Sequence, residues 1–582
     1  MMKRQMGLLL LLATLAILFL PAGVTSGEWR LETARQLEQR LQPFMVAESL
    51  ACPDQGFDLQ TNLIRFYRLR QFEPAWVDRY GLLPEGAMAL AMLKQAGRQG
   101  LFDTDYHSPW LNDLLDGMIT RPVIIGAAFD GKQVQLDLTI TGMVLRYAYH
   151  HSRGHTEPRM IGREGPGELN PTSDLAVALV EALGRGRLEA FFEQLEPRHK
   201  AYRALRHSLP RYQRIQAAGG WGVIDEGHAL TKGDCGPRVA QLRHRLILSG
   251  DIRMTSEGTA DCFGGNLAAA VSSFQQRHGL SADGVAGPRT LAALNIPVAQ
   301  RIRQIQLSLE RWRWLPHDLG SRYVLVNIPA FQMQVVEEGR VIKTMRTIVG
   351  QQDRPTPALA SVMTYLEINP YWHVPAKIAR EDLLPKIQAN PSYLTRQKIR
   401  VFESWAESAR ELDPRAIDWS SLSADYFPFR LRQEPAGRNA LGRVKFMFPN
   451  EVSVYIHDTP SKGLFRKPSR PFSSGCVRVE EPLALVSLLL NRQGWDQERL
   501  AAAVASNERQ IVILDEPVPV YLVYMTAWAA APGEIHFQED IYGHDQTLAG
   551  SLARRSVLPK ACRQTLGLPT YLGGAFGKDQ AL

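Results

Sequence analysis

The chain has 582 residues, which is too long for a single hydrophobic core and predicts about three to four domains. Its formal net charge of +8 is small for this length, so it argues only weakly for an anionic partner such as an acidic wall polymer. The chain has no long Lys/Arg tract and no nucleic-acid recognition motif, and we therefore exclude nucleic acid as a partner.

Residues 1–26 follow the plan of a secretory signal peptide. Basic Lys3 and Arg4 precede an apolar run over residues 8–20, and Pro21 and several small residues follow. This order predicts export from the cytoplasm. A second interpretation stays open, in which the segment is retained as an inner-membrane anchor, because the run with its flank approaches the roughly 17 to 25 residues that a membrane-spanning helix needs.

The chain contains five cysteines, an odd number. In an oxidising compartment at least one of them should stay free or pair between chains, and Cys476 is the expected free thiol. Cys235 and Cys262 flank a small module. They either form a disulfide or are two small buried residues, and the sequence leaves both interpretations open. Cys52 and Cys562 lie near opposite ends of the chain and belong to no local motif.

Residues 27–220 are predicted to form a helical scaffold domain, because apolar residues such as Leu37 and Leu41 recur near helical spacing. No catalytic pattern appears in this region. Three histidines follow the helical stretch at residues 136–149, but acidic or cysteine partners are missing nearby in the sequence, which favours a solvated helix end over a metal site. These histidines are His150, His151 and His155. We therefore expect no bound metal.

Residues 228–297 are predicted to form three short helices around one small core. The motifs of this segment are Lys232-Gly233-Asp234, Ala-Val-x-x-Phe-Gln at 270–275, His278-Gly279-Leu280, Asp283-Gly284 and Gly-Pro-x-Thr-Leu at 287–291. This pattern resembles the peptidoglycan-binding domain found in many wall enzymes. The alternative is a generic helical spacer.

From residue 322 the apolar period changes to two, which predicts a β-rich domain over residues 322–515 with a hairpin-rich antiparallel sheet. Residues 376–441 become helical and irregular with many charges, and they are expected to form an insertion that caps the sheet. Residues 516–582 are expected to be a C-terminal extension whose tail has little periodicity. The whole chain is thus predicted to be a multidomain α+β protein.

The chemistry of the chain is expected at Cys476, which follows a Ser-Gly turn and precedes a strand-like run. A thiol attacks only as thiolate, and with a reference pKa of about 8.5 it needs a neighbouring base, for which His457 is the candidate. Backbone N–H groups around Ser474 and Gly475 are expected to meet an oxyanion. Arg478 should point to the same side of its strand as Cys476 and steer a substrate carboxylate. The pattern predicts a cysteine acyl-transfer site.

The motifs His457-Asp458-Thr459 and Ser-Ser-Gly-Cys-Val-Arg-Val at 473–479 are similar to the signature of the L,D-transpeptidases, the YkuD-like cysteine enzymes of bacterial walls. That signature is written His-Gly-Thr and Ser-His-Gly-Cys-x-Arg. By this resemblance Cys476 is the nucleophile and His457 the base. Asp458 replaces the usual glycine but is expected to orient the imidazole through its backbone carbonyl, and Ser474 replaces the usual second histidine.

Two further motifs, Asn-Pro-Tyr-Trp-x-Val-Pro at 369–375 and Asn-Ala-Leu-Gly at 439–442, look like those of the large periplasmic Gram-negative subgroup of this family. The resemblance implies a scaffold domain, a peptidoglycan-binding domain and a catalytic domain with an inserted capping subdomain. Within this frame Tyr455, Trp372 and Tyr371 are expected to line the site of the donor stem peptide. Packing in the core is the alternative for each ring.

The resemblance implies an enzyme that attacks the third residue of a tetrapeptide stem, releases D-alanine and forms third-to-third peptidoglycan cross-links through a cysteine thioester. It implies no metal or organic cofactor, acylation of Cys476 by carbapenems, a periplasmic location, and functional links to a D,D-carboxypeptidase and a glycan synthase. Two kinds of alternative stay open. One is an L,D-carboxypeptidase or lipoprotein-anchoring enzyme that uses the same site, and the other is an inactive wall-binding structural protein.

Overall fold

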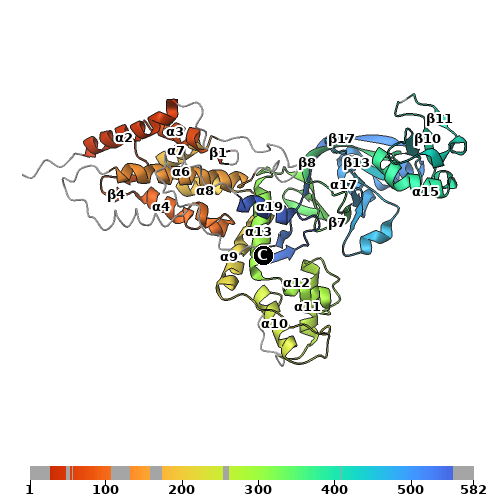
Figure 1. Ribbon diagram of the computed structural model, residues 1–582, viewed down its shortest axis with the longest axis horizontal. Helices are drawn as coiled ribbons and strands as arrows, with labels where there is room; N and C mark the ends of the chain where they lie inside the picture. The colour runs from red at the N-terminus through yellow and green to blue at the C-terminus, as the bar shows by residue number, and fades with distance from the viewer. Residues whose placement is uncertain are drawn as a thin grey trace, which may run out of the picture.

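The computed structural model describes residues 26–46, 53–54, 57–106, 131–156, 174–252, 261–406, 408–531 and 533–554. The expected signal segment up to residue 25, Cys52 and Cys562 lie outside these residues. Within them, no helix combines the length and the apolar character that crossing a membrane requires. The molecule is elongated, with a helical region at one end, a β-rich domain toward the other and a small helical module beside the middle (Figure 1).

The N-terminal region is helical, as predicted, and is built around one buried helix, α6 (Lys132–Arg153). Most side chains of α6 are buried because neighbouring helices cover it on several sides. Among these neighbours are α2 (Ser26–Val46), α3 (Leu59–Leu69), α4 (Pro84–Leu93) and α7 (Leu175–Gly184), and α8 (Leu188–Gln194) contacts α6 through the rings of Phe192 and Tyr147. The same region contains two short antiparallel strand pairs, β1 (Pro53–Asp54) with β2 (Phe57–Asp58) and β3 (Val77–Asp78) with β4 (Gly81–Leu82).

A central hub joins the parts of the molecule. It consists of α9 (Lys200–Ala217), α13 (Val298–Arg313) and the hairpin of β18 (Ala527–Ala531) and β19 (Glu534–Phe537), and it shares one apolar core with the adjacent strands of the large sheet. The expected scaffold domain of residues 27–220 therefore includes a helix, α9, whose core is shared with the β-rich domain. Periodicity alone cannot assign a helix to a partner, because it shows only that one face is apolar.

The small module contains three helices, as its motifs predict: α10 (Pro237–Ser249), α11 (Gly265–Arg277) and α12 (Pro288–Leu294). They enclose an apolar core of their own. Cys235 and Cys262 form a disulfide, which decides between the two interpretations that the sequence leaves open. Cys476 is the free cysteine of the described residues.

The β-rich domain is one nine-stranded sheet in the order β15-β7-β16-β14-β13-β8-β17-β5-β6. Because β6 also pairs with β7, the sheet closes on itself around an apolar core that α17 (Pro482–Leu490) and α18 (Gln497–Ala505) complete. The strands are β5 (Arg322–Asn327), β6 (Gln332–Glu337), β7 (Arg340–Gly350), β8 (Leu359–Ile368), β13 (Val444–Met447), β14 (Ile456–His457), β15 (Pro471–Ser473), β16 (Val477–Val479) and β17 (Gln510–Val523).

Two features of this sheet differ from the sequence prediction. The pairs β14–β16, β15–β7 and β17–β5 are parallel, whereas an antiparallel sheet was expected. The expected domain end at residue 515 lies inside β17, which continues to Val523 after a register shift between Ile513 and Val518. Alternation identifies strands but not their pairing partners, and this irregularity interrupts the alternation.

The capping insertion is larger than the expected residues 376–441. The chain leaves the sheet after Ile368 and returns at Val444, and between them lies a four-stranded sheet in the order β11-β10-β12-β9. Its elements are β9 (Trp372–His373), α14 (Ala376–Ile378), the π-helical turn η4 (Ala379–Leu383), α15 (Leu384–Ala389), α16 (Ser392–Arg396), β10 (Ile399–Phe402), β11 (Glu411–Leu412) and β12 (Arg430–Gln433). We call residues 369–443 the cap.

The last described element is α19 (His544–Ala553), in a stretch where little periodicity was expected. Buried Asp545 of α19 accepts a hydrogen bond from Arg311 of α13 at 2.5 Å and from Thr526 at 2.6 Å. The ion pair between Arg311 and Asp545 therefore fixes the position of α19, although the sequence pattern of this helix is weak.

Candidate active site

Cys476 lies in the short loop between β15 and β16, and two hydroxyl side chains fix the shape of this loop. Ser473 Oγ donates to the carbonyl of Cys476 at 2.5 Å and accepts from the N–H of Gly475 at 3.2 Å. Thr356 Oγ1 donates to the carbonyl of Gly475 at 2.7 Å. The φ of Gly475 is +112°, a conformation that side chains disfavour, so a glycine is needed immediately before the thiol.

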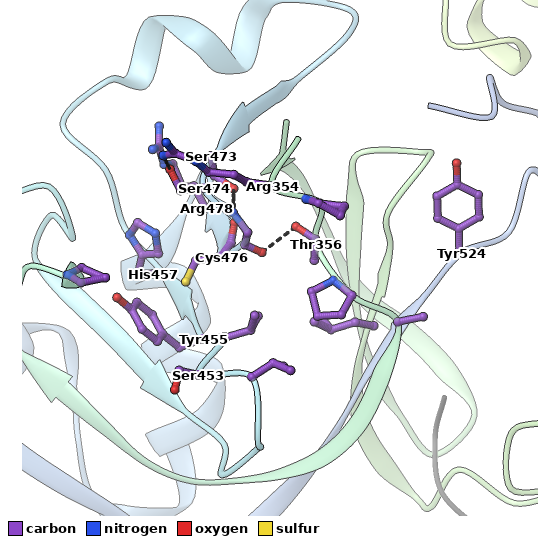
Figure 2. A pocket seen from close by; sticks show the side chains of 18 of the residues that line it. Arg354, Thr356, Ser453, Tyr455, His457, Ser473, Ser474, Cys476, Arg478 and Tyr524 are labelled. Carbon is purple, nitrogen blue, oxygen red and sulfur yellow. Dashed lines mark hydrogen bonds between the residues drawn. The ribbon is translucent and has the colours of Figure 1, made fainter. Parts of the chain in front are cut away.

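His457 lies on the strand next to that of the thiol, because β14 pairs with β16 in parallel with Ile456 opposite Val477. The imidazole is buried, and its Nδ1 lies 2.5 Å from the carbonyl oxygen of Asp458. Nδ1 must therefore carry the proton and donate it, which leaves Nε2 as the acceptor. In Figure 2 the sulfur of Cys476 points toward the His457 and Tyr455 rings.

The surroundings keep both groups uncharged in the resting protein. Burial lowers the pKa of His457 to about 3, and the positive charges of Arg478 and Lys445 lower it as well. Burial raises the pKa of the Cys476 thiol, although hydrogen bonds from the backbone and hydroxyl of Tyr455 oppose this effect. The arrangement is a neutral thiol beside a neutral imidazole, which suits proton transfer during attack rather than a preformed ion pair.

Asp458 supports the histidine with its carbonyl, as expected, but it cannot donate to an oxyanion. Its N–H donates to the carbonyl of Val444 at 2.9 Å. Its carboxylate accepts from the N–H of Arg443 at 2.7 Å and from Lys462 Nζ at 2.6 Å. Gly442, with a φ of +60°, lies so close that a Cβ there would meet the carboxylate at 2.2 Å. Asp458 therefore shapes the turn that closes the cap.

The groups expected to donate to an oxyanion differ in whether they already make a hydrogen bond. The N–H of Gly475 already donates to Ser473, and Ser474 Oγ accepts from Arg354 Nη1 at 3.2 Å. Among the described residues, the N–H of Cys476 has no backbone acceptor. The same holds for the backbone N–H of Ser474, so the amides of Ser474 and Cys476 are the candidate donors for a developing oxyanion.

One cavity of about 850 Å³ contains these groups. It extends from the cap to α13 and α19, and Figure 2 shows Tyr524 of β17's C-terminal connection on the far side of Thr356 from the thiol. Of the predicted site residues, the cavity wall includes Cys476, His457, Ser474, Gly475, Arg478, Tyr455 and Trp372.

Two of the expected aromatic residues behave differently. Trp372 lines the cavity and also packs against the core of the cap, so both interpretations of this ring apply. Tyr371 is not part of the cavity wall, and its ring lies 4.5 Å from the guanidinium carbon of Arg432 instead.

Sequence reasoning missed three residues of this site: Arg354, Thr356 and Lys445. Arg354 and Thr356 belong to the loop between β7 and β8, far from the motifs in the sequence. The sequence gives a weak indication of Lys445. It alternates with the buried Val444 and Phe446, so its side chain points away from their core. Only the strand pairing shows that this face is the site.

The histidine cluster of the scaffold is buried, not solvated as expected. His150, His151 and His155 are 1%, 1% and 3% exposed. The acidic partners missing from the local sequence come from elsewhere, since His155 lies 3.2 Å from Asp105 and 3.4 Å from Glu310 of α13. Within the described part of the chain, no three His, Cys, Asp or Glu side chains are grouped to hold a metal ion.

Three family models match the chain. Residues 321–513 match the L,D-transpeptidase catalytic domain, residues 61–209 a scaffold domain, and residues 235–294 a domain described as "Putative peptidoglycan binding domain". The chain therefore combines a catalytic domain of the L,D-transpeptidase family with scaffold and peptidoglycan-binding domains. This finding confirms the resemblance that the motifs indicate, and it confirms the multidomain α+β fold.

A Haemophilus influenzae protein named "Putative L,D-transpeptidase" is 37% identical over 246 residues, which are 42% of this chain and 49% of that protein. The chain thus matches about half the length of this curated relative. A solved L,D-transpeptidase from Xylanimonas cellulosilytica is 17% identical over 51% of this chain and 99% of that chain, with a TM-score of 0.17. A solved L,D-transpeptidase from Stackebrandtia nassauensis is 15% identical over 52% of this chain and 96% of that chain, with a TM-score of 0.21.

Proposed function

We propose that this protein is a cysteine L,D-transpeptidase that forms third-to-third cross-links in peptidoglycan. The observation that carries the proposal is the pairing, inside a matched catalytic domain, of the free thiol of Cys476 with a neutral His457 whose Nε2 is left to accept a proton. The cavity of about 850 Å³ is large enough for an extended peptide substrate.

In the first step the sulfur of Cys476 attacks the carbonyl carbon of the third residue of a tetrapeptide stem. His457 takes the thiol proton and returns it to the amine of D-alanine as the C–N bond breaks, which leaves a thioester. In the second step a side-chain amine of another stem attacks the thioester, and its proton passes through His457 to the departing sulfur. The C–S bond breaks, a new C–N bond forms, and the free thiol is restored.

Other acceptors for the thioester define the alternatives. Water would make the protein an L,D-carboxypeptidase, and a lipoprotein lysine would make it an anchoring enzyme. The large cap and the separate peptidoglycan-binding module favour a second wall strand, because both provide surface for a polymeric partner. An inactive wall-binding protein is less favoured, because the loop of the thiol leads into β16, β16 pairs with the strand of its base, and both groups line one cavity.

The test is mass spectrometry of the mature protein incubated with disaccharide-tetrapeptide, with Cys476→Ala beside it. We expect a dimer that has lost one D-alanine with the wild-type protein and none with the variant. Tripeptide alone would favour the carboxypeptidase, and unchanged substrate with both proteins would favour the wall-binding protein. A carbapenem adduct should form on the wild-type protein only, and an adduct on Cys476→Ala would overturn the role of this thiol.

The proposal also places the protein in a reaction sequence and a compartment. Tetrapeptide donors must be supplied by a D,D-carboxypeptidase that trims pentapeptides, and the strands by a glycan synthase. Peptidoglycan-directed domains support a location in the periplasm, with export through the segment at residues 1–26. Spheroplast fractionation, which separates periplasmic from cytoplasmic protein, tests this location.

A further inference from the structure

Lys445 faces the thiol site from a neighbouring strand, and the proposed reaction does not yet use it. In the sheet Lys445 of β13 pairs with Glu367 of β8 on one side and with His457 of β14 on the other, and His457 pairs with Arg478 of β16. Residues that pair directly across neighbouring strands lie on the same face. Glu367, Lys445, His457 and Arg478 thus form one row across four strands.

The row contacts the thiol through Tyr455. The Nζ of Lys445 lies 4.2 Å from the centroid of the Tyr455 ring, and the Tyr455 and His457 ring centroids are 5.6 Å apart. In Figure 2 the sulfur of Cys476 points toward the Tyr455 ring, and Tyr455 opposes the rise in the pKa of the thiol that burial causes. A cation over an aromatic face is attracted by the ring quadrupole, so Lys445 holds the ring that lies beside the sulfur.

Positive charge exceeds negative charge around this contact. The nearest anion to Lys445 is Glu367, whose Oε1 is 4.0 Å from Nζ and whose Oε2 is bound more closely by Arg509 Nε at 2.7 Å. On the other side of the row, the Nε of Arg478 is buried without a hydrogen-bond partner among the described residues. Lys445 and Arg478 therefore flank the imidazole in the row, and the one carboxylate of the row, Glu367, is shared between Lys445 and Arg509.

The cap adds no anion to this cluster. His373 of β9 also lines the cavity, and burial together with Arg430 and Arg432 lowers its pKa, so it is uncharged near neutrality. Burial also lowers the pKa of Lys445, but the negative charges of Glu367 and of the Cys476 thiolate oppose this shift. The thiolate is thus one of the two anions that stabilise the charge of Lys445.

We propose that Lys445 is a positioning residue of the thiol site, which holds the Tyr455 ring beside the sulfur and stabilises the Cys476 thiolate when it forms. The proposal rests on the proposed function for the role of Cys476 as nucleophile. A cation near a thiol favours the thiolate, and a cation near an imidazole disfavours the imidazolium. The first effect favours attack, and the second keeps the imidazole unprotonated before attack.

The experiment measures alkylation of Cys476 by iodoacetamide in the full mature chain, followed by intact mass between about pH 5 and pH 10. This reagent is uncharged and needs no substrate or acceptor, so the part of the alkylation that is absent from Cys476→Ala reports the Cys476 thiolate. In Lys445→Met we expect the rate near neutral pH to fall about tenfold and the midpoint of the profile to move to higher pH, since a pKa increase of about one unit lowers the thiolate fraction tenfold. Lys445→Arg, which keeps the charge, should restore most of the rate.

Two further variants separate electrostatics from a folding defect. Lys343→Met removes a lysine that pairs with Glu481 on the surface of the same domain, and its profile should match the wild type. Glu367→Gln removes the anion next to Lys445 at nearly constant shape, so its profile should move to lower pH, opposite to Lys445→Met. A loss of packing cannot produce shifts of opposite sign.

The proposal is overturned by a Lys445→Met profile that superimposes on the wild type, by Lys445→Arg as slow as Lys445→Met, or by Glu367→Gln moving in the same direction as Lys445→Met. The release of D-alanine from tetrapeptide by the wild-type protein is measured in parallel. If the wild type releases none while the alkylation profiles shift as expected, the proposed function fails and the effect of Lys445 on the thiol stands.

Discussion

The pKa of His457 determines how the thiol site responds to acid. An imidazole with its ordinary pKa would be protonated around pH 6, and the site would lose its base there. Because burial and two neighbouring cations lower the pKa of His457 to about 3, the uncharged form persists as the pH falls and is lost only near pH 3. Acylation of Cys476 is therefore expected to keep its base through the mildly acidic range.

We expect His457→Gln to lower the rate of Cys476 acylation by roughly 10²- to 10⁴-fold, because the variant has no group to take the thiol proton. In the wild type, the acylation rate should not fall through protonation of His457 between about pH 7 and pH 5. Carbapenem acylation followed by intact mass measures both. His228→Gln, an exposed histidine of the small module, is the control. An acidic midpoint near the ordinary histidine pKa in the wild type would contradict this expectation.

At the scale of elements, the cap is attached to the sheet at its base and at one distant contact. At the base, Asn369 donates its N–H to the carbonyl of Arg443 at 2.8 Å, and Asn439 Nδ2 donates to the carbonyl of Pro370 at 3.0 Å. The two motifs that mark this subgroup in the sequence therefore join the two ends of one insertion. Their asparagines fasten the base of the cap.

The distant contact is a set of ion pairs between the β7–β8 loop and the π-helical turn η4 of the cap. Arg354 donates to Asp382 at 2.6 and 3.0 Å and to Glu381 at 2.7 Å, and the same guanidinium donates to Ser474 in the loop of the thiol. Arg354 thus ties the closed cap to the nucleophile loop. Movement of the cap must break these pairs.

Asp382→Asn should loosen the cap while leaving the bond from Arg354 to Ser474 in place. Half-exposed ion pairs contribute about 1 kcal/mol, so we expect amide exchange in residues 376–383 to become about fivefold faster. Hydrogen–deuterium exchange with mass spectrometry measures it. Asp425→Asn, an exposed aspartate elsewhere in the cap, is the matched control. Equal exchange in the two variants would show that the ion pairs do not hold the cap.

At the scale of the whole molecule, the β18–β19 hairpin connects the small module to the hub. Arg277 of α11 binds Asp251 within the module and also donates to the carbonyl of Ile535 in β19 at 2.5 Å. The ring of His278 stacks on Phe537 with centroids 5.7 Å apart. The hairpin thereby fixes the distance between the module that is proposed to bind the wall and the thiol that is proposed to act on it.

Arg277→Gln should free the module from the hub. Its removal leaves the buried carboxylate of Asp251 without its cation, a change that costs about 3 to 5 kcal/mol for buried pairs. We expect a lower melting temperature by calorimetry and a larger radius of gyration by small-angle X-ray scattering. Arg289→Gln, an exposed arginine of α12, is the control. An unchanged radius together with unchanged melting would show that the module is held by other contacts.

Features that depend on neighbouring residues could be predicted from the amino-acid sequence. The alternation of strands, the three helices of the small module, and the Ser-Ser-Gly-Cys turn that places Cys476 before β16 are all local, because backbone geometry and side-chain size act over a few residues. The motifs around His457 and Cys476 also led to the family, which the matches confirm.

The tertiary structure alone decided which distant segments meet. Lys445, Arg354 and Thr356 reach the thiol through strand pairing and a loop that no local pattern connects to it. His155 of the scaffold is buried next to its acidic partner Glu310 of α13. The N–H of Asp458 donates to the carbonyl of Val444 in the sheet. Pairing, register and burial depend on contacts between residues far apart in the chain, and periodicity contains no information about those contacts.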